Sequence, residues 1–159
     1  MYLSARKYIG NYDGSAAEEK RSYAEVLKAA GVRGLTVAPW APHLSVEVCV
    51  AYWRKANAIH RWFVTYCQGG VDDCRAYSVS REQLEELCHK CEKTLKGRGT
   101  ARGVRTAKES LPTASGCFFG ETDFGSDYWY SLGDTAAQIR EVLGNKSLEG
   151  FDFSYKSSW

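Results

Sequence analysis

The sequence contains no long apolar run. No stretch approaches the roughly 20 consecutive apolar residues that a helix needs to span a bilayer. The opening residues, MYLSARKYIGNYDG, also lack the continuous apolar segment of a signal peptide. We therefore expect a cytoplasmic protein without a membrane partner. In that compartment the six cysteines are expected to be reduced thiols rather than disulfides.

The sequence also lacks a strong charge of either sign. Its 21 basic and 19 acidic residues give a formal net charge of +2, which disfavours generic binding to nucleic acid or to acidic membranes. Hydrophobic residues make up 44% and charged residues 25% of the 159 positions, close to the composition of an ordinary globular domain. We expect one compact domain over residues 1–159, with any anion site confined to a local patch.

Familiar catalytic motifs are missing as well. The chain has no G-x-S-x-G elbow, no H-E-x-x-H pair and no P-loop, so we favour a protein that does not catalyse a reaction. Cys88 and Cys91 have the C-x-x-C spacing of a zinc site. Both fall on the apolar stripe of a predicted helix, where a thiol behaves as a small hydrophobe. We therefore predict no metal and no other cofactor.

The residues that are present predict an α+β fold, with about four helices packed on a small, mostly antiparallel sheet. Capping boxes at Ser15 and Ser80, a cap at Asp127 and apolar residues at steps of three and four indicate the helices. Alternation of apolar and polar residues indicates the strands. The predicted helices are 15–30, 52–67, 81–96 and 127–143, and the predicted strands are 45–50 and 151–155, with short strands or extended loops at 34–42 and 117–119. The basic segment 97–110 is expected to be a loop, a short helix or an insertion.

The helix predicted over residues 52–67, YWRKANAIHRWFVTYC, carries most of the candidate site. One apolar stripe at helical spacing is predicted to face the core, and it consists of Tyr52, Ala56, Ile59, Phe63 and Tyr66. Polar groups beside that stripe are typical of a ligand site, because such sites place a few polar groups against apolar walls. The side chains concerned are Trp53, Asn57 and His60 on one flank, with Arg54 and Arg61 on another side.

This helix and the aromatic share of 13% predict a nucleotide-type pocket. Aromatic rings stack on bases, and a guanidinium group is a bidentate partner for phosphate. The candidate ligand contacts are stacking by Trp53, Trp62 or Trp129, hydrogen bonds from Asn57 and His60, and phosphate binding by Arg54 or Arg61. Asp73, which follows a glycine pair, completes the candidate set, because with His60 it would supply acid–base groups in an enzyme.

Several strings of the sequence resemble a family of small, uncharacterised phage and prophage proteins. They are YWRKANAIHRWFV, VDDC, LPTASGCFFGETDF, DYWY and the terminal YKSSW. The resemblance covers most of the chain. Two features depart from it: the basic stretch GRGTARGVRT looks like an insertion, and Cys117 stands where a third aromatic residue would suit the segment. The resemblance implies a viral origin and expression in the cytoplasm of a bacterial host.

The leading hypothesis is a phage-type binding protein that captures a small nucleotide-derived ligand without catalysis. Phage proteins of one class act in this way, by sequestering a nucleotide signal of bacterial immunity. Two alternatives stay open: an inhibitor that binds a host protein through exposed aromatic residues, and a small enzyme acting on a nucleotide or a phosphorylated substrate. Direct DNA binding ranks lowest because the net charge is small. The sequence leaves open whether the protein forms a homo-oligomer.

Overall fold

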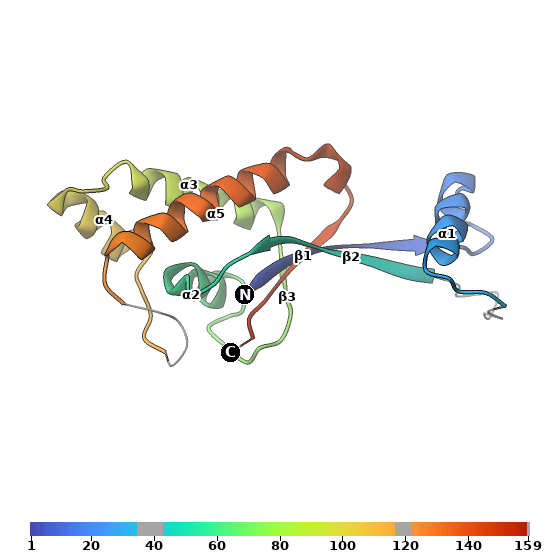
Figure 1. Cartoon of the computed structure of the whole chain (residues 1–159), viewed down its shortest axis with the longest axis horizontal. Helices are drawn as coiled ribbons and strands as arrows, with labels where there is room; N and C mark the ends of the chain where they lie inside the picture. The colour runs from blue at the N-terminus through green and yellow to red at the C-terminus, as the bar shows by residue number, and fades with distance from the viewer. Residues whose placement is uncertain (35–42, 117–121, 159) are drawn as a thin grey trace. The chain divides into compact units, whose positions relative to one another are not determined.

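The structure is a computed structural model in which residues 1–34, 43–116 and 122–158 are described. Its elements in chain order are β1 (Tyr2–Gly10), α1 (Ala17–Ala29), β2 (His43–Tyr52), α2 (Asn57–Tyr66), β3 (Tyr77–Val79), α3 (Arg81–Leu95), α4 (Ala101–Ser110), α5 (Ser126–Gly144), the 3-10 helix η1 (Lys146–Leu148) and β4 (Asp152–Lys156) (Figure 1). The prediction of an α+β fold with helices on a small antiparallel sheet is confirmed. The described ranges hold five α-helices, one more than expected.

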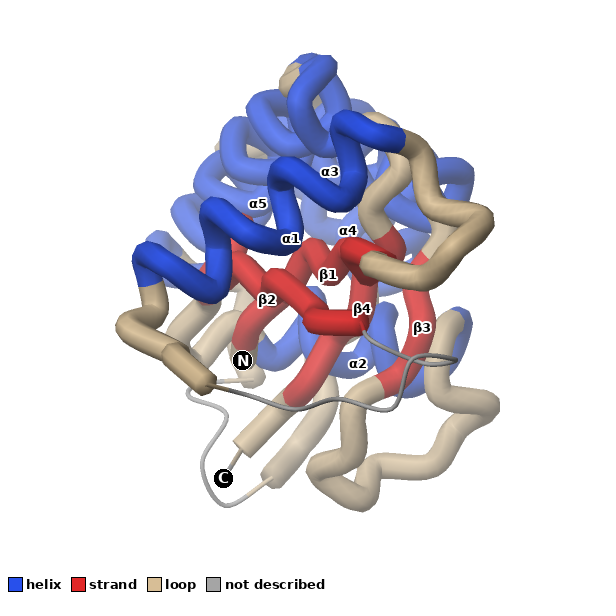
Figure 2. Tube along the Cα trace, turned by 90° about the vertical axis from the view of Figure 1, so that its right-hand side faces the viewer, coloured by secondary structure: helices blue, strands red, loops and turns tan. Residues whose placement is uncertain are grey.

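The four strands form one antiparallel sheet in the order β2-β1-β4-β3, drawn in red in Figure 2. β3 pairs with β4, and Val79 lies opposite Phe153. Phe153 and Tyr155 are buried and, being two residues apart, point to the same face of the sheet. Phe63 of α2 stacks on Tyr155 with ring centroids 3.9 Å apart, and the guanidinium of Arg81 in α3 lies 5.7 Å from the centre of the Phe153 ring. α2 and α3 therefore cover the same face.

Contacts between residues divide the chain into two units, residues 6–48 and residues 1–5 with 49–159. The unit 6–48 contains α1, residues 6–10 of β1 and residues 43–48 of β2. Gly31, with a φ of 71°, follows the end of α1, as predicted. The predicted cap of this helix is wrong: Ser15 Oγ accepts the N–H of Tyr12 instead, and the helix begins at Ala17.

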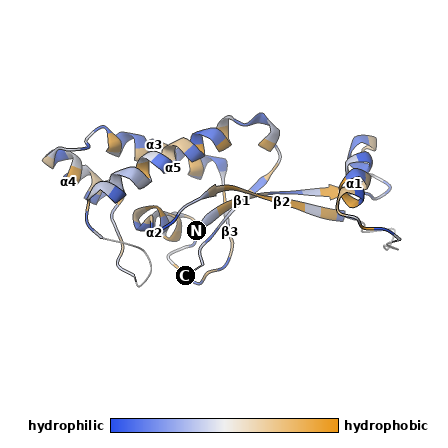
Figure 3. Ribbon diagram, in the orientation of Figure 1, coloured by the Kyte–Doolittle hydropathy of each residue, from blue (hydrophilic) through white to orange (hydrophobic). Residues whose placement is uncertain are grey.

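The helix predicted from Tyr52 begins five residues later, at Asn57. β2 continues to Tyr52, the N–H of Trp53 donates to the carbonyl oxygen of Met1 at 2.9 Å, and Lys55 turns the chain with a φ of 57°. Tyr52 and Trp53 therefore do not belong to the helix. The predicted core stripe is wrong at both ends, because Tyr52 is 59% exposed and Tyr66 is 49% exposed. The ribbon of α2 that remains shows both apolar and polar residues (Figure 3).

The capping box predicted for α3 is confirmed. Ser80 Oγ accepts the N–H of Gln83 at 3.2 Å, and Gln83 Oε1 accepts the N–H of Ser80 at 2.8 Å. The predicted apolar stripe of this helix is buried at Leu84, Leu87, Cys88 and Cys91. α3 packs along α5 (Figure 1). α5 begins at Ser126, so Asp127 lies in its first turn rather than at its cap.

Residues 97–110, expected as a basic loop, a short helix or an insertion, contain the helix α4. Thr100 Oγ1 accepts the N–H of Gly103 at 2.9 Å and caps it. A Cβ atom at Gly103 would lie 1.8 Å from the carbonyl oxygen of Gly97, so the backbones meet at a distance that only glycine allows. β1 and β3 were not predicted. In the predicted segments 34–42 and 117–119, every residue except Gly34 falls outside the described residues. Among the helices described, none has both the length and the apolarity needed to cross a membrane.

Candidate functional site

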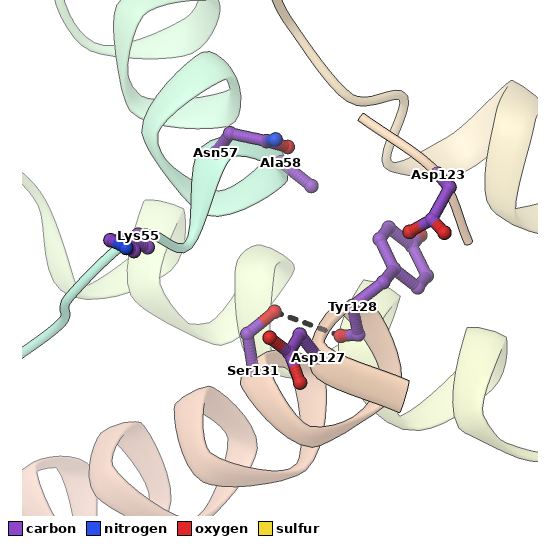
Figure 4. A pocket seen from close by; sticks show the side chains of 7 residues that line it. All are labelled: Lys55, Asn57, Ala58, Asp123, Asp127, Tyr128 and Ser131. Atoms are coloured by element: carbon purple, nitrogen blue, oxygen red, sulfur yellow. Dashed lines mark hydrogen bonds between the residues drawn. The ribbon is translucent and has the colours of Figure 1, made fainter. Parts of the chain in front are cut away.

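Two cavities adjoin α2, and both include Ala58 in their walls. The first, which we call the carboxylate cavity, has a volume of about 140 Å³ and is lined by Lys55, Asn57, Asp123, Asp127, Tyr128 and Ser131 (Figure 4). The second, the arginine cavity, has a volume of about 180 Å³ and is lined by Arg61, Trp62, Thr65, Tyr66, Glu109 and Ser110, among others. Both belong to the unit that contains residues 49–159.

The N-terminus of α2 forms part of the carboxylate cavity. Ala56 at the N-cap offers no side-chain acceptor, and the first turn holds no acidic residue. The first N–H groups of a helix have no partner within the helix and carry a partial positive charge. Ala58 presents this turn to the cavity, and the ammonium group of Lys55 adds a full positive charge beside it.

Two carboxylates face these positive groups across the cavity. Asp123 precedes α5 and accepts the N–H of Gly125 at 3.1 Å through Oδ1, and Asp127 lies in the first turn of α5. Within the described residues, Lys55, Asp123 and Asp127 form no ion pair within 4.0 Å. Figure 4 shows Asn57 and Asp123 on opposite sides of the same opening. The cavity therefore presents exposed charges of both signs.

The floor of the carboxylate cavity is buried and uncharged at Asn57 and Tyr128. Asn57 is 4% exposed and Tyr128 is 6% exposed. The Tyr128 hydroxyl donates to the carbonyl oxygen of Leu111 at 3.0 Å, and burial raises the pKa of this phenol, which keeps it protonated. Ser131 donates its hydroxyl to the carbonyl oxygen of Tyr128 at 2.8 Å, the dashed line in Figure 4.

The arginine cavity combines one guanidinium group with aromatic and hydroxyl side chains. Arg61 Nη1 donates to the carbonyl oxygen of Thr113 at 2.6 Å, which fixes the guanidinium at the cavity wall. Trp62 is 2% exposed, whereas Tyr66 is 49% exposed. The ammonium of Lys90 lies 4.3 Å from the centre of the Tyr66 ring. Tyr66 is thus the accessible aromatic surface of this cavity.

His60 lies in a separate, buried chain of hydrogen bonds. Its Nδ1 is 2.7 Å from the Tyr155 hydroxyl, its Nε2 is 2.9 Å from Asp72 Oδ2, and Ser157 donates to Asp72 Oδ1 at 3.5 Å. A carboxylate only accepts, so we assign the ring proton to Nε2, and Nδ1 then accepts from the Tyr155 hydroxyl. His60 is 3% exposed and Tyr155 is 0% exposed. This chain orients an imidazole, but it leaves no ring nitrogen within reach of a ligand.

The structure brings three of the predicted site residues to the two cavities and places the others elsewhere. Asn57 lines the carboxylate cavity, and Arg61 and Trp62 line the arginine cavity. The remaining candidates, Trp53, Arg54, His60, Asp73 and Trp129, are not among the residues that line either cavity.

The three indole rings proposed for base stacking lie in the core. Trp53 Nε1 donates to Thr135 Oγ1 at 2.9 Å, and Trp129 Nε1 donates to the carbonyl oxygen of Phe124 at 2.9 Å. Trp53, Trp62 and Trp129 are 2%, 2% and 6% exposed, so stacking on a ligand would require them to move.

Asp73 acts within its own turn. Its carboxylate accepts the Arg75 N–H at 3.1 Å and the Tyr77 hydroxyl at 3.1 Å, and it pairs with the Arg75 guanidinium at 2.9 Å. Its neighbour Asp72 is the carboxylate that contacts His60.

The sequence interpretation missed Lys55, Asp123, Asp127 and Tyr66 as site residues. Asp127 was predicted only as a helix cap. An acidic side chain near a helix N-terminus indicates where the helix starts, and it gives no local sign of a binding site. Nothing local links Asp127 to Lys55, because the two positions meet only when α5 packs beside α2.

Three of the described cysteines are poor nucleophiles because they are buried or partly buried. Burial raises the pKa of Cys67 to about 12 and also raises the pKa of Cys88 and of Cys91. Cys88 and Cys91 lie in the core cluster. Across residues 1–34, 43–116 and 122–158, no group of three or more His, Cys, Asp or Glu side chains could hold a metal ion.

Comparison of the chain with protein-family models, with curated proteins and with solved structures found no match. The chemistry of the two cavities is therefore the basis for interpreting the site.

Proposed function

We propose that this protein binds a small nucleotide-derived ligand along α2 and releases it chemically unchanged. One observation carries the proposal: two cavities with polar side chains in their walls adjoin the same helix and share Ala58. With volumes of about 140 and 180 Å³, each is smaller than the roughly 300–1,000 Å³ of a typical ligand pocket. A ligand of nucleotide size would therefore occupy both.

The arginine cavity suits the phosphate end of such a ligand. Arg61 Nη1 is held by Thr113, and the rest of its guanidinium fork can donate to phosphate oxygens. Thr65 and Ser110 add hydroxyl groups to the same wall, and the half-exposed ring of Tyr66 offers an apolar surface.

Binding without turnover is supported by the environments of His60 and Cys67, which lie in and directly after α2. His60, the predicted acid–base residue, has both ring nitrogens engaged in the core. The thiol of Cys67 has a pKa of about 12 and is a poor nucleophile near neutral pH. The resemblance to phage proteins adds a biological role to the proposal, which is the sequestration of a nucleotide signal of bacterial immunity in the host cytoplasm.

A second candidate is an inhibitor that binds a host protein. It is favoured by large aromatic side chains on the surface, among which Tyr130 is 73% exposed and Tyr52 is 59% exposed. This candidate requires no small ligand, so the same experiment separates the two.

The test is a thermal-shift panel of mononucleotides and cyclic nucleotides against the wild type, Arg61→Ala and Arg54→Ala. Ligand at a hundred times its Kd adds about 2.7 kcal/mol, which raises the Tm of a domain of this size by roughly 5–10 °C. Arg54→Ala is the matched control, because Arg54 is exposed and lines neither cavity. We expect Arg61→Ala to lose most of the shift and Arg54→Ala to keep it.

The ligand recovered after denaturing the complex should have its original mass. A changed mass would replace the binding proposal by the enzyme alternative. If no nucleotide shifts the Tm, or if both arginine variants lose the shift equally, the site is not the one proposed, and a host protein becomes the leading partner.

A further inference from the structure

We infer that the carboxylate cavity binds a guanine base, an inference that rests on the nucleotide ligand proposed above. The cavity has a volume of about 140 Å³. Roughly five water molecules fill that volume in the liquid, at about 30 Å³ each. That is the scale of one flat ring system rather than of a whole nucleotide. The sugar and phosphate would then extend past Ala58 toward Arg61.

The carboxylates of the cavity are hydrogen-bond acceptors, so we expect them to bind a ligand edge that carries hydrogen-bond donors. Asp123 and Asp127 lie on the α5 side and, within the described part of the chain, neither forms an ion pair. Asp123 uses Oδ1 for the N–H of Gly125, and Asp127 uses Oδ1 for the hydroxyl of Ser126 at 3.4 Å. An ionised carboxylate has about four acceptor positions. Each therefore keeps capacity for a ligand donor.

The opposite wall carries positive charge, so we expect it to bind a hydrogen-bond acceptor on the same ligand. It is lined by Lys55, Asn57 and Ala58, and the N-cap residue Ala56 offers the first turn of α2 no side-chain acceptor. These groups together attract a carbonyl oxygen, because the helix N-terminus and the ammonium are both positive. Figure 4 shows this wall on the α2 side of the opening and the carboxylates on the other.

Guanine is the common base that presents this combination. Its N1–H and its N2 amino group are neighbouring donors, and its O6 carbonyl lies beside them. Adenine and cytosine each have an amino group next to a ring acceptor, which would face a carboxylate unfavourably. Hypoxanthine keeps the N1–H and O6 of guanine but lacks the amino group. A phosphate group in this cavity would face two carboxylates without an ion-pair partner among the described residues, whereas in the arginine cavity it would face one carboxylate, Glu109, together with the guanidinium of Arg61.

The experiment measures Kd by calorimetry for guanosine, inosine and adenosine 5′-monophosphates. The wild type should bind the guanine nucleotide about tenfold more tightly than the inosine nucleotide, since one contact of about 1.4 kcal/mol is lost. It should bind the adenine nucleotide more weakly still. The double variant Asp123→Asn, Asp127→Asn should bring the guanine-to-inosine ratio close to one. Asp152→Asn, an exposed carboxylate in β4 outside both cavities, should leave the ratio unchanged.

The outcomes separate this inference from the proposal beneath it. Equal affinity of the wild type for guanine and adenine nucleotides, with binding still lost in Arg61→Ala, overturns the guanine subsite and leaves the nucleotide site standing. Absence of binding for all three nucleotides overturns both. The three Kd values of the wild type test the inference without any substitution. The inference can therefore be contradicted even if a variant fails to fold.

Discussion

At the scale of single residues, His60 is held at both ring nitrogens. It belongs to α2, and its partners come from the turn that precedes β3 and from β4. A buried imidazole without partners would cost free energy, whereas one with a donor and an acceptor does not. Because Tyr155 and Asp72 supply these, we interpret His60 as a residue that joins three elements rather than as a catalyst.

Removing the Tyr155 hydroxyl tests this interpretation. Tyr155→Phe keeps the ring that stacks on Phe63 and takes the donor away from His60 Nδ1. We expect the free energy of unfolding to fall by about 1–3 kcal/mol, the usual cost of leaving a buried polar atom without its partner, as measured by urea denaturation.

Tyr130→Phe provides the control. Its side chain is 73% exposed, so the same chemical change should alter stability by less than about 0.5 kcal/mol. If Tyr155→Phe were as stable as the wild type, the hydrogen bond to His60 would contribute nothing to holding β4.

At the scale of elements, the contact between the end of α3 and α4 depends on two glycines. The Cβ of an alanine at position 103 would lie 1.8 Å from the oxygen and 2.3 Å from the carbonyl carbon of Gly97. Backbone atoms cannot rotate aside as a side chain can. α4 also supplies Glu109 and Ser110 to the arginine cavity, so this crossing positions one wall of the candidate site.

Gly103→Ala should therefore destabilise the protein by about 1–3 kcal/mol or more, as overpacking does elsewhere. Gly133→Ala is the matched control inside α5, where an added Cβ meets no atom within 4 Å. It should stabilise the protein by about 0.5–1 kcal/mol through helix propensity. Thermal denaturation of the two variants side by side should show a lower Tm for Gly103→Ala and a higher Tm for Gly133→Ala. If Gly103→Ala left the Tm unchanged, α4 could move away from α3.

The elements that the sequence predicted well carry their own signals. Ser80 with Gln83 marks the start of α3, and the alternation around Phe153 and Tyr155 marks β4. The start of α2 was wrong because the step from Tyr52 to Ala56 happens to fit a helix. The pairing that extends the chain past Tyr52 involves Met1, which is 52 residues from Trp53. Local periodicity cannot report such a contact.

In the candidate site, too, the residues with a local sequence signal were predicted and those that depend on distant contacts were not. Asn57 and Arg61 were predicted because α2 is a strong helical pattern with polar residues on its flanks. The carboxylates were not, because Asp123 and Asp127 lie more than 60 positions from Asn57 and approach it only in the folded chain. The tryptophans were overvalued as ligand contacts, since large aromatic residues serve the core at least as often as a binding surface.

At the scale of the whole molecule, the features argued above fall in one of the two units. Both cavities, the His60 chain and the glycine crossing lie within residues 1–5 and 49–159. The global stability of this unit therefore bears directly on binding. Several of its buried groups titrate only at high pH, which makes that stability depend on pH in a defined direction.

The groups concerned are Tyr128, Tyr155 and Cys67, and burial is the main cause that raises the pKa of each. In the unfolded chain a phenol has a pKa of about 10 and a thiol one of about 8.5. Below these values the three groups are protonated in both states, and their contribution is present in full. As the pH rises above them the unfolded chain loses protons that the folded chain keeps, so stability falls.

We therefore expect a Tm that stays level between about pH 7 and 8 and then decreases with growing steepness beyond about pH 10. Thermal scans in matched ionic strength from pH 7 to pH 11 measure this curve. The decrease above pH 10 should be shallower in Tyr155→Phe, because one of the buried phenols that resist ionisation has been removed. Two results would contradict this prediction: a Tm that holds level up to pH 11, or a slope that is unchanged in Tyr155→Phe. Either would mean that these phenols ionise as readily in the folded protein as in the unfolded chain. The burial of Tyr128, which forms part of the floor of the carboxylate cavity, would then be wrong.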